Sequence, residues 1–267
     1  MKKIMFIGNG FDILHGINIT FHDFVNSKTF QDNIKSYKDY FDNDEYKKFS
    51  EETELWSRFE DYCKHIVETK NIKGFAFIKK ICLLFQEWFK IQKTKDVTLN
   101  ESLKEFIASN NIETIISFNY TNTTNIYGFN NFYFESNSDR KDYANINSWK
   151  DKTVMLHAYK SKEIQMVLGH DKNKLINKNR ITRNWGINRK FDPKKQVLKT
   201  ILKSNEISEI IFLGFSFGDS DEEIVNFAKE IINKRKAITI FYHNKINPSI
   251  EKHFKETKFC KIKETIF

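Results

Sequence analysis

Short apolar runs recur along the chain and predict the strands of a sheet. Ile4 to Ile7 is apolar without alternation, as expected for a strand that is buried on both faces. Similar runs are found at residues 112–118, 153–157, 207–213 and 238–242. Helical patterns at about residues 194–205 and 220–235 separate the later runs. This alternation predicts an α/β fold with a Rossmann-like, doubly wound, mostly parallel sheet.

A long helical stretch separates the first predicted strand from the second. Apolar side chains recur at helical spacing within residues 51–70 and 75–92, and a further helix is predicted at 99–110. Roughly ninety residues are too many for a single crossover between parallel strands. We therefore predict one domain over residues 1–267, with a helical insertion at about residues 20–110.

The composition excludes several classes of protein. The chain has 267 residues, of which 40% are hydrophobic, enough for a substantial core. Its three cysteines form no CxxC pair, which argues against a disulfide scaffold or a structural zinc site and favours a reduced, cytoplasmic protein. No apolar run approaches the length of a membrane span, so we expect no membrane partner.

The net charge of +9 is unevenly distributed. Residues 171–200 contain ten Lys or Arg against two aspartates, a local charge of +8. Such a segment can attract the phosphates of a nucleotide, a nucleic acid or an acidic partner, but it is equally explained as a Lys- and Asn-rich surface loop. Its only aromatic residues, Trp185 and Phe191, offer little for base stacking, so nucleic acid is not the favoured partner.

Polar clusters follow four of the predicted strands. They comprise Gly8, Asn9, Gly10 and Asp12, then residues 119–124, then His157, and finally residues 214–221. The carboxyl ends of parallel strands lie along one edge of a sheet, so these clusters are predicted to meet in one crevice. Asn9, Asn119, His157, Ser216 and Asp219 are expected to line it, above a floor formed by Gly8 to Gly10. Turn or helix-cap chemistry explains the other clusters taken alone, and His157 alone is explained as a satisfied, partly buried histidine, so this prediction depends on their joint placement.

Several of these motifs together resemble a known family. The chain reads IGNGFD-xx-HG at Ile7–Gly16, SFNYTNT at Ser117–Thr123, VLGHD at Val167–Asp171 and GFSFGDSD at Gly214–Asp221. In order and spacing they resemble the bacterial abortive-infection AbiH family over essentially the whole chain. That family is in turn distantly similar to sirtuin-like, NAD-consuming domains of anti-phage systems.

The resemblance implies a nucleotide site and names the residues that would form it. Asn119 and His157 match the residues that carry the chemistry in sirtuin-like domains, and Asp12 lies beside them as a third candidate catalytic residue. The expected nucleotide contacts are Gly8, Asn9, Gly10, Phe11, Tyr120, Thr121, Gly214, Ser216, Asp219 and Asp221. The expected ligand or substrate is NAD or a related nucleotide, without a tightly bound cofactor or a metal. A phage-encoded trigger or partner protein, and an oligomer, are also compatible with the resemblance.

Cleavage of NAD at the nicotinamide–ribose bond agrees with these residue types. Nicotinamide leaves as a neutral base while the ribose becomes oxocarbenium-like, as in glycoside cleavage. His157 would act as the base, and Asn119 would orient the attacking water or a ribose hydroxyl. Asp12 is expected near the ribose or nicotinamide end, because a diphosphate would repel it. Deacylating sirtuins hold a four-cysteine zinc module that three cysteines cannot provide, so we expect hydrolysis.

Two alternatives stay open. The chain has Ala158 after His157 and Thr121 after Tyr120, where sirtuin-like domains carry Gly and Asp. These departures agree with a catalytically inactive nucleotide sensor. The basic residues 171–200 agree instead with a nucleic-acid-binding or nuclease effector.

Overall fold

The fold is a sheet of parallel strands with helices on both faces. The computed structural model describes residues 2–17, 21–34, 36, 80–81, 83–85, 87–89, 97–119, 121–135, 146–160, 164–166, 193–215, 217, 222–242, 246–255 and 257–265. Its strands are β1 (Lys2–Ile7), β2 (Ile112–Ser117), β3 (Asn130–Glu135), β4 (Lys152–Lys160), β5 (Ile164–Met166), β6 (Ile207–Leu213), β7 (Ala237–Tyr242) and β8 (Cys260–Glu264). Its helices are α1 (Asn9–Leu14), α2 (Phe21–Val25), α3 (Lys28–Ile34), α8 (Glu101–Ser109), α11 (Pro193–Lys203), α12 (Glu222–Asn233) and α13 (Pro248–Phe254), with 3-10 helices η2 (Thr123–Tyr127) and η3 (Ile146–Trp149).

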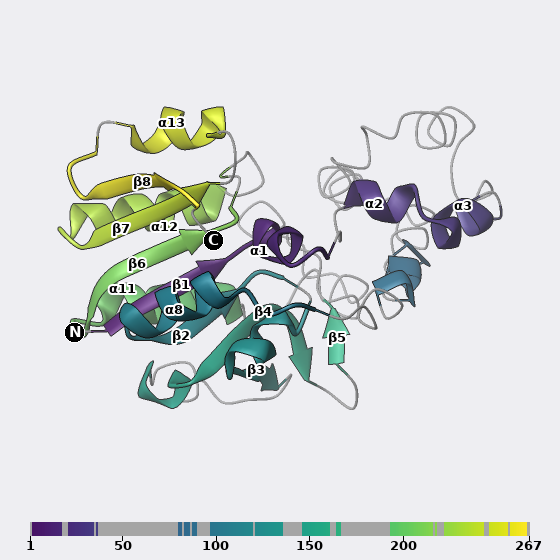
Figure 1. Ribbon diagram of the computed structural model, residues 1–267, viewed down its shortest axis with the longest axis horizontal. Helices are drawn as coiled ribbons and strands as arrows, with labels where there is room; N and C mark the ends of the chain where they lie inside the picture. The colour runs from purple at the N-terminus through teal and green to yellow at the C-terminus, as the bar shows by residue number, and fades with distance from the viewer. Residues whose placement is uncertain are drawn as a thin grey trace, which may run out of the picture. The chain divides into compact units, whose positions relative to one another are not determined.

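Seven strands lie side by side in the order β3-β4-β2-β1-β6-β7-β8 (Figure 1) and run parallel to one another. The short β5 pairs antiparallel with the end of β4. The predicted parallel α/β fold is therefore confirmed, and all five predicted strands are present. The strand order changes direction at β1, which pairs with β2 on one side and β6 on the other. In this class of fold, ligands bind outside the carboxyl ends of the strands at such a point.

Alternate residues of the strands form the two apolar layers that hold the sheet and its helices together. Ile4, Phe6 and Phe212 are buried in the layer shared with α11, α12 and α13. Met5 and Ile7 are buried in the other layer, which α1 and α8 cover. Burial on both faces explains why β1 and its neighbours appear in the sequence as continuous apolar runs. Helix α8, which the sequence grouped with the insertion, packs in this second layer against the sheet.

A second compact unit comprises residues 17–96 and 167–190. Within it, the described residues between 80 and 89 are helical, as predicted for residues 75–92. Phe24 of α2 contacts Phe30, Phe85 and Trp88 with ring centroids 5.1 to 5.6 Å apart, and all four rings are buried. This aromatic cluster joins α2 and α3 to that helix. The predicted helix at 51–70 and the basic residues 171–192 lie outside the described residues.

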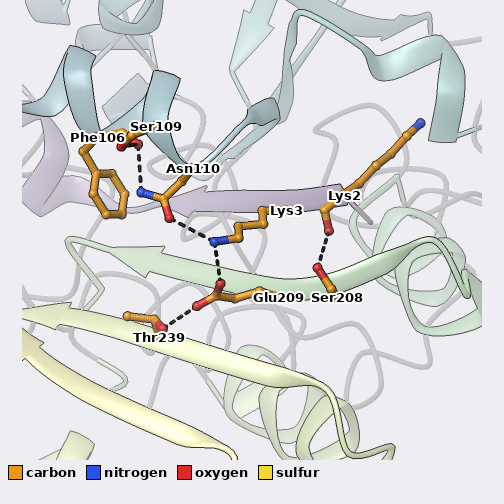
Figure 2. Close-up of polar contacts among 8 residues, drawn as sticks. All are labelled: Lys2, Lys3, Phe106, Ser109, Asn110, Ser208, Glu209 and Thr239. Atoms are coloured by element: carbon orange, nitrogen blue, oxygen red, sulfur yellow. Dashed lines mark hydrogen bonds and ion pairs between the residues drawn. The ribbon is translucent and has the colours of Figure 1, made fainter.

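A polar network links the amino-terminal parts of three strands (Figure 2), at the opposite end of β1 from its Gly turn. Lys3 of β1 donates to Asn110 Oδ1 at 2.9 Å and lies 3.1 Å from Glu209 Oε2 of β6. Glu209 also accepts a hydrogen bond from Thr239 of β7 at 2.7 Å. Burial raises the pKa of Glu209, but the hydrogen bonds from Thr239 and Lys3 and the charges of Lys3 and Lys261 outweigh it, so the pKa lies below its usual value.

Glu209→Gln is expected to lower the free energy of unfolding by about 1 kcal/mol at pH 7. A carboxyl whose pKa is lower in the folded protein stabilises the fold above its unfolded pKa, and this contribution is lost as the pH falls through the folded pKa. The difference between variant and wild type should therefore be smaller at pH 3 than at pH 7. Urea unfolding at both pH values measures it.

Glu206→Gln is the matched control, because Glu206 pairs with Lys2 at 3.4 Å but its side chain is 52% exposed. Exposed ion pairs contribute little to stability, so this control should match wild type at both pH values. An equal effect of Glu209→Gln at pH 7 and pH 3 would show that Glu209 acts through packing rather than through its charge.

Candidate functional site

The turn after β1 packs backbone to backbone against the end of β6. Gly8 N donates to Leu213 O and Gly10 N to Gly214 O, both at 3.0 Å. A Cβ on Gly10 would lie 2.6 Å from Gly214 Cα, and a Cβ on Gly8 would lie 2.6 Å from Gly214 O. Only glycine fits such a close approach of two backbones. This packing accounts for the GxG pattern whether or not a ligand binds there.

The amides of the turn are largely used within the protein. Phe11 N donates to Gly8 O at 2.9 Å, in addition to the bonds made by Gly8 and Gly10. The Phe11 side chain is fully buried in the apolar layer under α1 and α8, so it packs in the core. Asn9, the first residue of α1, is exposed. Of the predicted contacts in this turn, Asn9 therefore presents its side chain to solvent.

Asp12, on α1, is the buried carboxyl of the site. Its side chain is 0% exposed, and Oδ1 accepts hydrogen bonds from Thr121 Oγ1 at 2.6 Å and Thr123 Oγ1 at 2.8 Å. Oδ2 has no hydrogen-bond partner among the described residues. Burial raises the pKa of Asp12 to about 7, although the two threonine hydroxyls act to lower it. The carboxyl therefore changes its charge near neutral pH, which suits acid–base or electrostatic chemistry.

Asn119 follows β2, the strand next to β1, and is also fully buried. Its Nδ2 donates to Gly8 O at 3.0 Å, and its backbone amide donates to Ser117 Oγ at 3.1 Å. Its Oδ1 has no hydrogen-bond partner among the described residues. Buried polar atoms of native proteins nearly always have a partner, so this oxygen is an acceptor to which a water molecule or a ligand can donate.

The structure thus brings together residues that the sequence placed at three different strand ends. The β1 turn touches Gly214 after β6, Asn119 bonds to Gly8, and Thr121 bonds to Asp12. The shared position of these residues at the carboxyl ends of β1, β2 and β6 follows the strand-end rule. Asp12 and Asn119 supply two buried oxygen acceptors without described partners.

The position of His157 differs in part from the prediction. We expected the third strand to end at this residue, but β4 continues to Lys160. The last residues of β4 pair with β5, from Ala158 to Lys160, and with β3 at Tyr159 and Lys160. Met155 pairs with Ser117 of β2, so His157 and Asn119 each follow that pair by two residues. The side chain of His157 lies outside the described residues, as do Tyr120, Ser216, Asp219 and Asp221.

A second buried polar chain, which the sequence analysis did not identify, ends at the C-terminus of α1. His15 Nδ1 lies 2.7 Å from Phe11 O, and His15 Nε2 lies 2.5 Å from Tyr127 Oη. A carbonyl can only accept, so Nδ1 carries the proton and Nε2 accepts from the tyrosine hydroxyl. Tyr127 Oη in turn accepts from Asn100 N at 3.2 Å. Burial lowers the pKa of His15, which keeps the ring neutral in this chain.

His15 and Thr123 belong to motifs that the sequence analysis quoted, but it did not identify either as a residue of the site. His15 belongs to the HG of IGNGFD-xx-HG, and Thr123 ends the SFNYTNT motif. Both motifs were used for the resemblance, but these side chains received no role. Their partners lie more than one hundred residues away, at separations of 112 and 111 positions, which no local pattern indicates.

Metal and membrane chemistry find no support in the described part of the chain. Within it, no three His, Cys, Asp or Glu side chains gather into a group that could hold a metal ion. Nor does any described helix combine the length and the apolar character needed to cross a membrane.

Comparison with protein families identifies the chain. The model of the bacteriophage abortive infection AbiH family matches residues 63–243, more than half of the 267 residues. The chain belongs to the AbiH family. No curated protein matches it. The AbiH match includes Asn119, His157 and Gly214, whereas Asp12 and the β1 turn precede it.

Proposed function

We propose that this AbiH-family protein is an anti-phage effector that binds a nucleotide and hydrolyses NAD or a related nucleotide at the nicotinamide–ribose bond. The observation that carries the proposal is the pair of buried side chains, Asp12 and Asn119, at the carboxyl ends of adjacent parallel strands. Each has an oxygen without a partner among the described residues. Membership of the AbiH family supports the anti-phage role.

The proposed chemistry assigns one role to each of three residues. Water attacks C1′ of the ribose as the bond from C1′ to the nicotinamide nitrogen breaks, and the bonding electrons neutralise the cationic ring. His157 takes the proton of the water, and Asn119 orients that water or a ribose hydroxyl. Asp12 in its ionised form stabilises the positive charge that develops on the ribose. The pKa of about 7 makes that form available near neutral pH.

The nucleotide is proposed to meet the protein at the turn after β1 and at Gly214. Gly8, Gly10 and Gly214 allow the two turns to pack closely, and the exposed Asn9 is the residue of the β1 turn that is proposed to face the ligand. The proposal includes Tyr120, Ser216, Asp219 and Asp221 as further contacts. It places the reaction in the cytoplasm, where a phage-encoded trigger would start it.

Incubating the purified protein with NAD and following nicotinamide and ADP-ribose tests the reaction. His157→Ala is expected to lower the rate by about two to four powers of ten, because a positioned base is lost. Asn119→Ala should lower it comparably, since the attacking water is no longer oriented. The affinity for NAD, measured by calorimetry, should change little for His157→Ala. His253→Ala on α13 is the control histidine variant and should retain full activity.

The same variants must be followed in phage-infected cells, because the enzyme is proposed to need a trigger. Depletion of NAD with wild type, and its absence with His157→Ala, supports hydrolysis. If NAD stays intact while the His157→Ala protein still protects the cells, the hydrolase proposal is wrong. Binding of NAD without a product would instead identify an inactive sensor, and DNA binding that weakens steeply with salt would identify a nucleic-acid effector.

A further inference from the structure

Two threonine hydroxyls converge on a single oxygen of Asp12. Thr121 Oγ1 and Thr123 Oγ1 donate to Oδ1 at 2.6 and 2.8 Å. Each hydroxyl has one hydrogen, which it gives to this carboxyl. Thr121 and Thr123 are themselves 6% and 4% exposed, so water does not compete strongly for these bonds. Oδ1 is thus engaged twice, while Oδ2 has no partner among the described residues.

This asymmetry has a chemical consequence. A buried carboxyl loses the hydration that favours its charged form, and donated hydrogen bonds are what can restore that form. Because both donors bind Oδ1, they favour the anion without covering Oδ2. The negative charge on Oδ2 is then available to a ligand, and when the carboxyl is neutral Oδ2 is the oxygen left to carry the proton.

We propose that Thr121 and Thr123 are positioning residues of the NAD cleavage, which hold Asp12 in its ionised form with Oδ2 directed to the ribose carbon that loses nicotinamide. This inference rests on the proposed function and extends it to two residues that do not touch the reacting atoms. Both hydroxyls belong to the segment after β2, and they bond to the carboxyl of Asp12 on α1.

The balance of forces on Asp12 agrees with this role. Burial raises the pKa of Asp12 to about 7, and the hydrogen bonds from Thr121 and Thr123 act in the opposite direction and lower it. No charged side chain among the described residues contributes to the shift. His15, the titratable group three residues along α1, is held neutral between Phe11 O and Tyr127. Burial therefore sets how far the pKa of Asp12 rises, and the two threonine hydroxyls are the groups that oppose it and preserve an ionised fraction near neutral pH.

Replacing either threonine by valine removes the hydroxyl and keeps the branched shape. Thr121→Val and Thr123→Val should each raise the titration midpoint of Asp12 by about one pH unit, and the double variant by about two. The kcat at pH 7 should fall about fivefold for one substitution and about fiftyfold for both, with KM little changed. The activity should recover as the pH is raised towards the new midpoint, which a loss of folding would not produce.

Two readouts and one control make the test decisive. Carbon-13 NMR of labelled aspartate carboxyls follows the midpoint without any nucleotide, with the Asp12 signal assigned by its loss in Asp12→Asn. The pH profile of NAD cleavage follows the rate. Thr121→Ser and Thr123→Ser keep the hydroxyl and should restore both the midpoint and the profile of wild type.

The outcomes separate this inference from the proposed function. If wild type cleaves NAD but the valine variants leave the Asp12 midpoint unchanged, the inference alone is wrong. If the titration midpoint of Asp12 moves but the pH profile of NAD cleavage does not, the threonines only satisfy the hydrogen-bonding needs of a buried carboxyl. The inference is then overturned as well. If the midpoint moves but triggered wild type cleaves no nucleotide, the proposed function is wrong. The threonines then have no role in catalysis either.

Discussion

Asp12→Asn is expected to stabilise the protein at pH 8 while it removes nucleotide cleavage. Burial raises the pKa of this carboxyl from its ordinary value of 3.8 to about 7. The folded protein then binds the proton more tightly than the unfolded chain, so stability is complete below about pH 4 and is lost as the pH rises through 7. The loss is on the order of 4 kcal/mol by pH 8, and the neutral asparagine avoids it.

Urea unfolding at pH 4 and pH 8, followed by tryptophan fluorescence, measures this gain. The difference between Asp12→Asn and wild type should grow by several kcal/mol between the two pH values. Asp32→Asn, on an exposed position of α3, is the control and should show no such change. An equal difference at pH 4 and pH 8 would show that Asp12 is not titrating in this range.

The same variant separates binding from chemistry. Removing a charge that acts on the developing oxocarbenium ion should lower kcat about 10²- to 10³-fold, as for other groups that stabilise transition-state charge. Binding of NAD should persist, because the asparagine keeps the shape of the side chain. The Asp12→Asn protein is thus expected to be more stable than wild type but inactive. This result is typical when a buried carboxyl lowers stability and is retained for function. Full turnover in Asp12→Asn would exclude Asp12 from the reaction.

Gly214→Ala is expected to lower the free energy of unfolding by about 2 to 5 kcal/mol. Gly214 has φ of 75°, which costs an L residue about 1 to 2 kcal/mol. Its new Cβ would lie 2.4 Å from Phe11 N and 2.7 Å from Gly10 C. Both are backbone atoms, so the turn after β1 must move away from β6, at a cost of about 1 to 3 kcal/mol more. Chemical denaturation at pH 7 measures the loss.

Gly128→Ala is the matched control, because Gly128 has φ of 86° but a Cβ there would have no atom of the described residues within 4 Å. This variant carries only the backbone cost of about 1 to 2 kcal/mol. Similar losses at Gly214 and Gly128 would contradict the close packing of the two turns. The contrast also tests whether the glycines serve the packing itself, since no nucleotide is present.

Sequence patterns identified the strands that are buried on both faces, and the physical reason is local. A strand such as β1 or β6 needs apolar side chains towards both layers, which leaves a continuous apolar run. Edge strands leave a weaker pattern. β8, at one edge, has three of its five side chains exposed, and β3 begins with two asparagines. Neither β3 nor β8 was predicted, because a strand with one partner needs less apolar surface.

The sequence also located Asp12, Asn119 and Gly214, because a polar cluster after a buried strand must lie at the carboxyl edge of a parallel sheet. It could not say how these residues meet. The Gly turn was predicted to form the floor of a nucleotide site, and in the fold it packs on Gly214 and donates its amides to Leu213 and Gly214.

The sequence by itself determined the parallel α/β fold and the strand ends at which the candidate site lies. Only the tertiary structure decided that Thr121 and Thr123 bond to Asp12 and that Tyr127 bonds to His15. These bonds join α1 to the segment after β2, between residues more than one hundred positions apart. Burial and hydrogen bonding at that distance set the charge of Asp12, and they arise only when β1 and β2 lie side by side.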